Sequence, residues 1–410
     1  MYARHPGAHI LLVTPYYWPE IAASVPLMRA VAEGLCQEGM RVTVLSSSTR
    51  EPLPAEDVIS LDPQKAPTLI RAWNPFTRRR SLAGKLMEFL WFFIQVMCHG
   101  LLVDQVDAIF VSSSPPLAGL PVALLGWLKD VPVVYNLQDL FPESAVASGL
   151  MRRNGFAFSG FTWLEHGTYR AVSKVIAISE EFARHVEKLA PGCPVTVIPN
   201  WVDTEALTAV PEEKNRFLPL LPDRKPFRVL YAGNLGYLQN LDLLLDAASL
   251  LQDEPAIQFL LVGDGSQKAA LKARAERKGL DNCVFMDFQP YALLADVYSA
   301  CQIGVVPMRP GAGQSSVPSK TWNYLACGKP VIACVEPETP FARLLQASGA
   351  GRVVSPSDPQ ALAATLREAM HESAQAQRWG ESGRQFVETH LSKRSAVNRY
   401  ADAIREVLGK

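Results

Sequence analysis

An excess of charge of either sign is missing from this sequence of 410 residues, because 40 Lys and Arg residues balance 40 Asp and Glu residues. A general nucleic-acid binder carries a strongly basic surface, so the balance argues against nucleic acid as a partner. The seven cysteines form no C-x-x-C pair and no His/Cys group at zinc spacing. These absences argue against a disulfide framework and a structural metal site, and favour free thiols in a reducing cytoplasm.

Targeting and nucleotide-binding signatures are absent as well. The apolar run that starts at Ile10 is short and leads into aromatic residues and proline, so we expect no secretion signal. No G-x-G-x-x-G follows this run, because residues 14–20 read TPYYWPE, and a Walker loop is missing. The sequence therefore lacks the phosphate-binding turns of a dinucleotide oxidoreductase or a P-loop NTPase.

What the sequence does contain is a repeated βα pattern. Short apolar runs alternate with stretches of helix length, which is typical of parallel strands covered on both faces by helices. A stretch with four prolines, at positions 211, 219, 222 and 226, interrupts the pattern, which then restarts. We predict strands at residues 10–15, 42–46, 108–112, 133–137, 175–178, 195–199, 228–232, 258–262, 284–288, 303–307, 331–334 and 352–355.

The predicted fold class is α/β, with two Rossmann-like doubly wound domains that face a central cleft. The prediction places an N-terminal domain at residues 1–210, a linker at 211–226 and a C-terminal domain at 227–390. Residues 391–410 are expected to form a helix that packs back on the N-terminal domain. This architecture by itself does not name a reaction.

The most specific pattern lies at residues 310–333, where a polar glycine loop leads into a helix and then into a strand. Lys320 falls in the first turn of that helix, where the helix dipole disfavours a cation. A bound diphosphate would supply its partner, although a solvated lysine is the alternative. Asn323 lies on the same helical face. Two more loops, at residues 233–236 and 263–266, allow close backbone approach, but each also reads as a plain βα turn, and Asp264 could cap the helix that follows.

Together these motifs resemble the family 4 retaining glycosyltransferases of GT-B fold. The resemblance covers nearly all of the chain, from residues 16–20 through 198–203, 233–236 and 262–265 to 326–332. Residues 111–116 and 136–146 look like the branch that builds bacterial exopolysaccharide and O-antigen units, of the colanic-acid fucosyltransferase and N-acetylfucosamine transferase types. This resemblance implies a hexosyl transfer from a UDP- or GDP-sugar, possible sugars being fucose or an N-acetylated deoxysugar.

The resemblance also implies the site residues, with three departures. Two glutamates common in the family correspond to Ser315 and Asn323, its diphosphate-binding Arg and Lys to Asn234 and Gln239, and its active-site His to Gln138. Because the branch named above shares these substitutions, they suggest a subfamily. The implied donor-binding residues are Gly233, Asn234, Gln239, Gly263, Asp264, Phe288, Gln314, Ser315, Ser316, Val317, Pro318, Ser319, Lys320 and Asn323, and the implied acceptor or diphosphate loop comprises Glu20, Ala22, Ala23 and Gln138.

Glycosyl transfer requires a nucleoside diphosphate to leave and an acceptor hydroxyl to be held beside the sugar. Lys320 and loop amides can meet the leaving-group charge, so no metal or other cofactor is expected, and no D-x-D triplet is present. Asp139 and Glu143 follow the strand at 133–137 and are the carboxylates expected to position the acceptor or stabilise the sugar. Capping of the next helix is the alternative role for Glu143.

A membrane-surface element is expected between residues 78 and 103. Arg78, Arg79 and Arg80 precede an apolar stripe with charged and polar interruptions, which favours docking on anionic lipid over a membrane span. A buried crossover helix of the first sheet is the alternative. With the branch resemblance, the stripe predicts a polyprenyl-diphosphate-linked saccharide acceptor at the inner face of the cytoplasmic membrane. The stripe comprises Leu86, Phe89, Leu90, Trp91, Phe93, Val96, Met97 and Leu101.

Two rival functions remain open on the sequence. A nucleotide-sugar epimerase would need an acid and a base on both sides of the sugar, and no second such pair is found. A non-catalytic GT-B nucleotide-sugar-binding subunit would keep the cleft and lose the Glu, Arg, Lys and His positions, as this sequence does.

Overall fold

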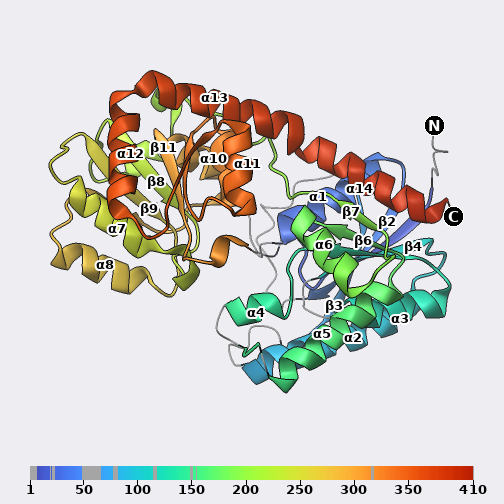
Figure 1. The fold of residues 1–410 in the computed structure, drawn as a ribbon. Helices are drawn as coiled ribbons and strands as arrows, with labels where there is room; N and C mark the ends of the chain where they lie inside the picture. Colours follow the sequence, from blue (N-terminus) through green and yellow to red (C-terminus); the bar gives the residue numbers. More distant parts are fainter. Residues whose placement is uncertain are drawn as a thin grey trace. The chain divides into compact units, whose positions relative to one another are not determined.

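The computed structural model describes residues 7–18, 20, 24–48, 66–76, 82–113, 118–147, 151–153, 155–314 and 318–409. The chain forms two compact units, Met1–Asn200 with Arg394–Lys410, and Trp201–Lys393. Each unit is a parallel β-sheet covered by helices (Figure 1). The α/β class with two Rossmann-like doubly wound domains is therefore confirmed.

The first unit contains a seven-stranded sheet of order β3-β2-β1-β4-β5-β6-β7, with every pair parallel. Strands β1, β4, β5 and β6 are buried at every position, which explains their predominantly apolar sequences. The sequence analysis missed β3, an edge strand exposed at most of its positions. The strands are β1 (His9–Val13), β2 (Arg41–Ser48), β3 (Thr68–Trp73), β4 (Ala108–Ser112), β5 (Val133–Leu137), β6 (Lys174–Ala177) and β7 (Val195–Val197).

Seven helices in the described part of the chain belong mainly to this unit. The last of them, α14, comes from the C-terminus and packs on the sheet, where the buried Tyr400 hydroxyl donates to Oδ1 of Asn136 at 3.1 Å. Lys174 of β6 pairs with Glu406 of the same helix. The helices are α1 (Val25–Gln37), α2 (Leu82–Leu102), α3 (Gly119–Lys129), α4 (Glu143–Ala147), α5 (Phe156–Ala171), α6 (Glu180–Leu189) and α14 (Lys393–Leu408).

Helix α2 has two apolar faces. Phe92 and Val96 are buried in the core against the sheet, as the crossover-helix alternative required. Leu90, Ile94 and Leu102 point outward and are 48%, 52% and 76% exposed. The predicted stripe thus combines a core face with an exposed face. Within the described residues, the structure has no helix that is long and apolar enough to cross a membrane.

The second unit repeats the architecture with a six-stranded parallel sheet of order β10-β9-β8-β11-β12-β13. Its two halves meet between β8 and β11. The strands are β8 (Phe227–Ala232), β9 (Ile257–Val262), β10 (Cys283–Met286), β11 (Ile303–Pro307), β12 (Val331–Cys334) and β13 (Gly351–Val354). The helices are α7 (Leu241–Leu250), α8 (Lys268–Arg277), α9 (Leu294–Ser299), α10 (Lys320–Ala326), α11 (Pro340–Ser348), α12 (Pro359–His371) and α13 (Ser373–His390).

The structure divides the chain at Asn200 and Trp201, before the expected boundary at residue 210. Residues 211–226 are packed in the second unit and do not form a free linker. Phe217 and Leu218 are fully buried in its core, and the side-chain amide of Asn215 donates to the carbonyl of Asp296 at 2.7 Å. The prolines stiffen short turns in this segment, and the apolar residues between them pack it against the core of the second unit.

Candidate functional site

The loops that carry the predicted donor-binding residues meet at one edge of the second sheet. Because all six strands are parallel, the loops after β8, β9, β11 and β12 leave from the same, carboxyl edge. The strand order reverses between the adjacent strands β8 and β11, because β9 and β10 follow on one side of this pair and β12 and β13 on the other. Ligands of doubly wound sheets bind beyond such a switch point, so this edge is the candidate donor site.

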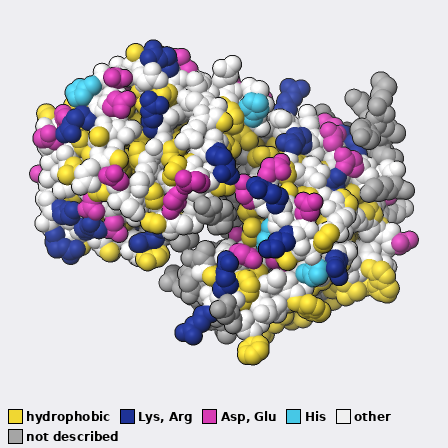
Figure 2. Space-filling model, viewed as in Figure 1, with side chains coloured by type: hydrophobic (Ala, Val, Ile, Leu, Met, Phe, Trp, Pro, Cys, Tyr) yellow, Lys and Arg dark blue, Asp and Glu magenta, His cyan; other side chains and the backbone are white. Residues whose placement is uncertain are grey.

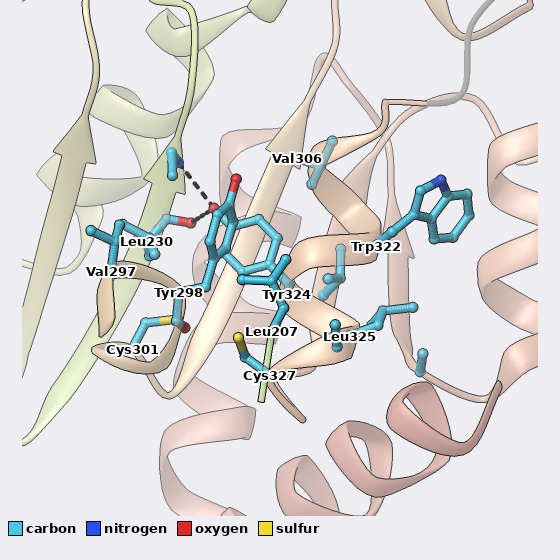
Figure 3. Packing of buried hydrophobic residues seen from close by; sticks show 14 of the residues in the cluster. Leu207, Leu230, Val297, Tyr298, Cys301, Val306, Trp322, Tyr324, Leu325 and Cys327 are labelled. Atoms are coloured by element: carbon cyan, nitrogen blue, oxygen red, sulfur yellow. Dashed lines mark hydrogen bonds between the residues drawn. The ribbon is translucent and has the colours of Figure 1, made fainter. Parts of the chain in front are cut away.

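Helix α10 is fixed to β8 by the buried Tyr324 (Figure 3). Its hydroxyl donates to the carbonyl of Leu230 at 2.8 Å and accepts from the N–H of Ala232 at 3.0 Å. The ring of Tyr298 packs edge-on against the ring of Tyr324, with centroids 4.7 Å apart. Asn323 forms a side-chain hydrogen bond with Tyr298. The face of α10 that carries Asn323 is therefore engaged with α9, and the expected contact of Asn323 with a ribose stays a prediction.

Lys320 begins α10 and reaches back to the loop after β8. Its Nζ donates to the hydroxyl of Tyr231 at 2.7 Å and to Oε1 of Gln239 at 3.0 Å, and it lies 4.1 Å from the ring centroid of Tyr231. No carboxylate of the described residues forms an ion pair with Lys320. Burial lowers the pKa of its ammonium group to about 7. An anion at this position would restore the charge that burial disfavours.

The glycine loops after β8 and β9 pack against each other. A Cβ on Gly263, at φ +150°, would lie 1.9 Å from the carbonyl oxygen of Gly233, and one on Gly265 would meet the backbone of Leu235. The N–H of Leu235 also donates to the carbonyl of Asp264 at 2.8 Å. Gly263 and Gly265 are therefore required by contact between two loops. At Gly233 the nearest neighbour of such a Cβ is Nζ of Lys320, at 3.2 Å.

The other predicted donor residues lie around this edge. Asp264 does not cap α8, because its Oδ1 accepts from the N–H of Gly265 next to it, while Gln267 occupies the capping position. Phe288, after β10, is 59% exposed, and Asn234 is also exposed. Gln314 ends a 3-10 turn, and Pro318 and Ser319 lead into α10. Ser315, Ser316 and Val317 lie outside the described residues.

Two charged residues at this edge were missed by the sequence analysis. Arg309 follows β11, and its guanidinium carbon lies 3.6 Å from the ring centroid of Tyr237 in the loop after β8. Glu336 follows β12, and its Oε1 accepts from the N–H of Gly311 at 2.7 Å. Their position directly after a strand was the only signal in the sequence, and it does not tell which neighbouring loop a long side chain reaches.

In the first unit the predicted acceptor residues lie around the carboxyl ends of β1 and β5. Glu20 is buried, and the side-chain amide of Gln138 donates to Oδ1 of Asn136 at 3.0 Å. Oδ2 of Asp139 accepts from the hydroxyl of Ser144 at 2.8 Å. Ala22 and Ala23, like Arg78, Arg79 and Arg80, lie outside the described residues.

Glu143 is the first residue of α4 and meets two groups that the sequence analysis did not name. Ligand atoms of Glu143, Glu165 and His185 all lie within 4.8 Å of one another, which makes them the candidate metal-holding group of the described residues. Glu165 is buried between the hydroxyl of Tyr169, which donates to its Oε1, and Nε2 of His185, 3.4 Å from its Oε2. Oε2 of Glu143 is buried and has no hydrogen-bond partner within the part of the chain that is described.

This surrounding shifts the acid–base behaviour of the cluster. Burial, and then the charge of Glu165, raise the pKa of Glu143. Burial lowers the pKa of His185, but hydrogen bonding to Glu165 and the charges of Glu165 and Glu143 outweigh it, so the pKa of His185 is raised. Desolvation likewise raises the pKa of Asp139, against the hydrogen bond from Ser144. Glu143 is the first residue of α4, so it is both an acidic residue in the first turn of that helix and a member of the carboxylate cluster.

Comparisons with known proteins match both halves of the chain. Residues 27–206 match the model of Glycosyltransferase Family 4, and residues 212–386 match that of Glycosyl transferases group 1. The chain is a glycosyltransferase with the GT-B fold. The glycosyltransferase is 26% identical to the probable glycosyltransferase WbjE of Pseudomonas aeruginosa over 309 residues, which are 74% of this chain and 76% of that protein.

Two further relatives cover comparable or larger parts of the glycosyltransferase. It is 29% identical to the putative colanic acid biosynthesis glycosyl transferase WcaI of Escherichia coli K12 over 289 residues, 69% of this chain and 70% of WcaI. Its structure superposes on that of Anabaena HepE in complex with UDP-glucose with a TM-score of 0.73, at 17% identity, over 97% of this chain and 99% of HepE. At that identity the superposition supports the fold alone.

Proposed function

We propose that this glycosyltransferase moves a hexosyl group from a UDP- or GDP-sugar to a lipid-linked saccharide in the synthesis of a bacterial exopolysaccharide or O-antigen. The name of WcaI supports a role in the synthesis of a bacterial polysaccharide, and the name of WbjE supports glycosyl transfer. The HepE complex shows that a protein of this fold binds UDP-glucose, which supports the proposal of a nucleotide-sugar donor for this chain. Fucose or an N-acetylated deoxysugar is the proposed sugar, because the sequence resembles transferases of those types.

The environment of Lys320 is the main observation that supports a donor site at this edge of the sheet. A half-buried ammonium group at the carboxyl edge of a doubly wound sheet, hydrogen-bonded to two neutral groups and to no carboxylate of the described residues, is suited to an anion. In the proposed reaction the bond between the anomeric carbon and the diphosphate oxygen breaks, and the oxygen of the acceptor hydroxyl bonds to the anomeric carbon from the same face of the sugar. The leaving diphosphate takes the proton of that hydroxyl. The anomeric configuration is retained, and no metal takes part.

The acceptor is proposed to be membrane-borne because α2, α3 and α5 share an exposed apolar face. Gly100 of α2 lies against Leu125 of α3, and Gly119 of α3 against Thr168 of α5, so the three helices are neighbours. Figure 2 shows hydrophobic side chains along the part of the first unit where Figure 1 draws these helices. Tryptophans at such a face are typical of membrane interfaces. The exposed residues of this docking face are Met87, Leu90, Ile94, Leu101, Leu102, Leu124, Trp127, Leu128, Phe156 and Trp163.

A donor screen tests the proposed function. We expect one of a set of UDP- and GDP-sugars to raise the melting temperature, since a ligand at 100 times its dissociation constant stabilises by about 2.7 kcal/mol. The stabilising donor is then incubated with and without polyprenyl-diphosphate-linked saccharide. Release of nucleoside diphosphate with glycosylated lipid supports the transferase. Stabilisation without any release would indicate a binding subunit, and an altered sugar without release an epimerase.

A further inference from the structure

The donor site as the sequence predicts it has little positive charge for its ligand. A nucleoside diphosphate carries at least two negative charges, and the loop at residues 233–239 contains no Lys or Arg. The resemblance to family 4 transferases implies that the diphosphate-binding positions of this loop are occupied by the neutral residues Asn234 and Gln239. Lys320 bonds Gln239 and so stands beside one of them. Sequence spacing offers no second cation within this loop.

Arg309 brings a second cation to the same loop from another strand. It follows β11, next to β8 in the sheet, and its Nε donates to the carbonyl of Tyr237 at 2.5 Å. Its guanidinium lies over the Tyr237 ring, which is 61% exposed. The residues between Gly233 and Gln239 are therefore contacted by Arg309 and by Lys320, which flank the switch point of the sheet.

Neighbouring carboxylates do not neutralise Arg309. The nearest one with which it pairs among the described residues is Asp242, whose Oδ2 is 4.0 Å from a terminal nitrogen of Arg309. Asp242 already forms a closer ion pair with Arg274. The Nε bond and the stacking contact fix the plane of the guanidinium, and its terminal N–H groups have no other hydrogen bond within the described residues. A planar fork of this kind matches two phosphate oxygens.

We propose that Arg309 binds the diphosphate of the nucleotide-sugar as a second cation beside Lys320, in place of the basic residues that the loop after β8 lacks. This inference rests on the proposed function, because it names a further residue of the same donor site. The loop after β8 then contributes backbone and neutral side chains, while both charges come from the half of the sheet that follows β11. Arg309 stabilises the leaving group together with Lys320 as negative charge develops on it.

Calorimetry on the full chain tests the proposal with three probes per base, UDP, UMP and uridine or their guanosine counterparts. For Arg309→Gln we expect diphosphate affinity to fall about 10- to 100-fold, as for a lost charge-assisted hydrogen-bonded pair, and nucleoside affinity to change less than about twofold. Arg309→Lys keeps the charge without the fork and should recover only part of the loss. Arg277→Gln, an exposed arginine at the end of α8, is the matched control and should bind like wild type.

The outcomes separate this inference from the proposed function. If Lys320→Ala weakens the binding of UDP or GDP but both Arg309 variants bind these nucleotides like wild type, Arg309 does not bind the diphosphate and the proposed donor site is retained. Arg309→Lys keeps the positive charge, so loss of charge cannot be the cause if this variant misfolds. If it weakens the binding of nucleoside and of nucleoside diphosphate equally, the inference is also overturned. If neither Lys320→Ala nor Arg309→Gln changes diphosphate affinity, the donor site itself is wrong.

Discussion

At the scale of single residues, the half-buried ammonium group of Lys320 should make donor binding depend on pH. Its pKa is about 7 in the free protein, and a bound diphosphate favours the charged form and raises that pKa. At pH 8 the free amine is mostly neutral, so binding should take up close to one proton, whereas at pH 6 it is already charged and uptake should be close to zero. Calorimetry in two buffers with different ionisation enthalpies measures this uptake.

The matching variant is Lys320→Ala. It should lose the extra proton uptake at pH 8 and lower turnover by a factor on the order of 100, with little change in stability. Uptake that is the same at pH 6 and pH 8, or that persists in Lys320→Ala, would assign the proton to another group.

Glu143 gives a second residue-scale prediction, on the acid side. Its pKa is raised by burial and by Glu165, so a role as hydrogen-bond acceptor for the incoming hydroxyl should be lost as pH falls through a value above the usual carboxyl range. Removing the neighbouring imidazolium with His185→Gln should raise the pKa of Glu143 further and move the acid limb of kcat/KM to higher pH. Glu143→Gln should lower kcat/KM by about 100-fold and abolish that limb.

The control for this prediction is Tyr169→Phe, which removes a neutral donor to Glu165 without changing the charge of the cluster. It should leave the position of the acid limb closer to wild type than His185→Gln does. A limb that stays in place in His185→Gln would show that Glu143 does not govern it. Loss of activity on chelation, restored by a divalent cation, would indicate that Glu143, Glu165 and His185 hold a metal.

At the scale of elements, α10 depends on Tyr324 for its place over β8. Tyr324→Phe would leave the N–H of Ala232 and the carbonyl of Leu230 without the hydroxyl that now satisfies them in the core. We expect unfolding free energy to fall by about 1–3 kcal/mol in urea titration, and diphosphate affinity to fall as well because α10 carries Lys320. Tyr291→Phe, at a tyrosine 69% exposed, should change neither, and an unchanged stability of Tyr324→Phe would contradict the assigned role.

At the scale of the whole molecule, the docking face on α2, α3 and α5 predicts peripheral membrane binding. Wild-type protein should float with anionic vesicles at low salt and less so at high salt, since basic residues contribute about 1 kcal/mol each near such a surface. The double variant Trp127→Gln, Trp163→Gln should reduce flotation. Replacement of Arg78, Arg79 and Arg80 by Gln should reduce it as well. Leu220→Gln, at a leucine 50% exposed in the second unit, is the matched control. Wild-type protein that stays at the bottom of the gradient would contradict a membrane role.

Strands whose two faces are buried were predictable because their sequences are predominantly apolar. The strands at residues 108–112 and 133–137 agree with β4 and β5, while the exposed edge strand β3 gave no such signal. The proline-rich segment at residues 211–226 was wrongly predicted to be a linker, because proline marks turns in buried and exposed segments alike. The burial of Phe217 and Leu218 shows that this segment packs in the core of the second unit. Lys320 could be found because glycine, serine and proline close to it in the chain mark the loop that presents it.

The fold class, the loops after the strands and the candidate residues within those loops could all be predicted from the amino-acid order, because periodicity and turn chemistry are local. Which of these loops contact one another through their side chains depends on the tertiary structure. Arg309 and Tyr237 are 72 residues apart, and Glu165 and His185 are 20 apart, so no local pattern relates them. Parallel pairing brings β11 beside β8 and the helices α4, α5 and α6 around one cluster, and the reach and charge of the side chains then fix the contacts.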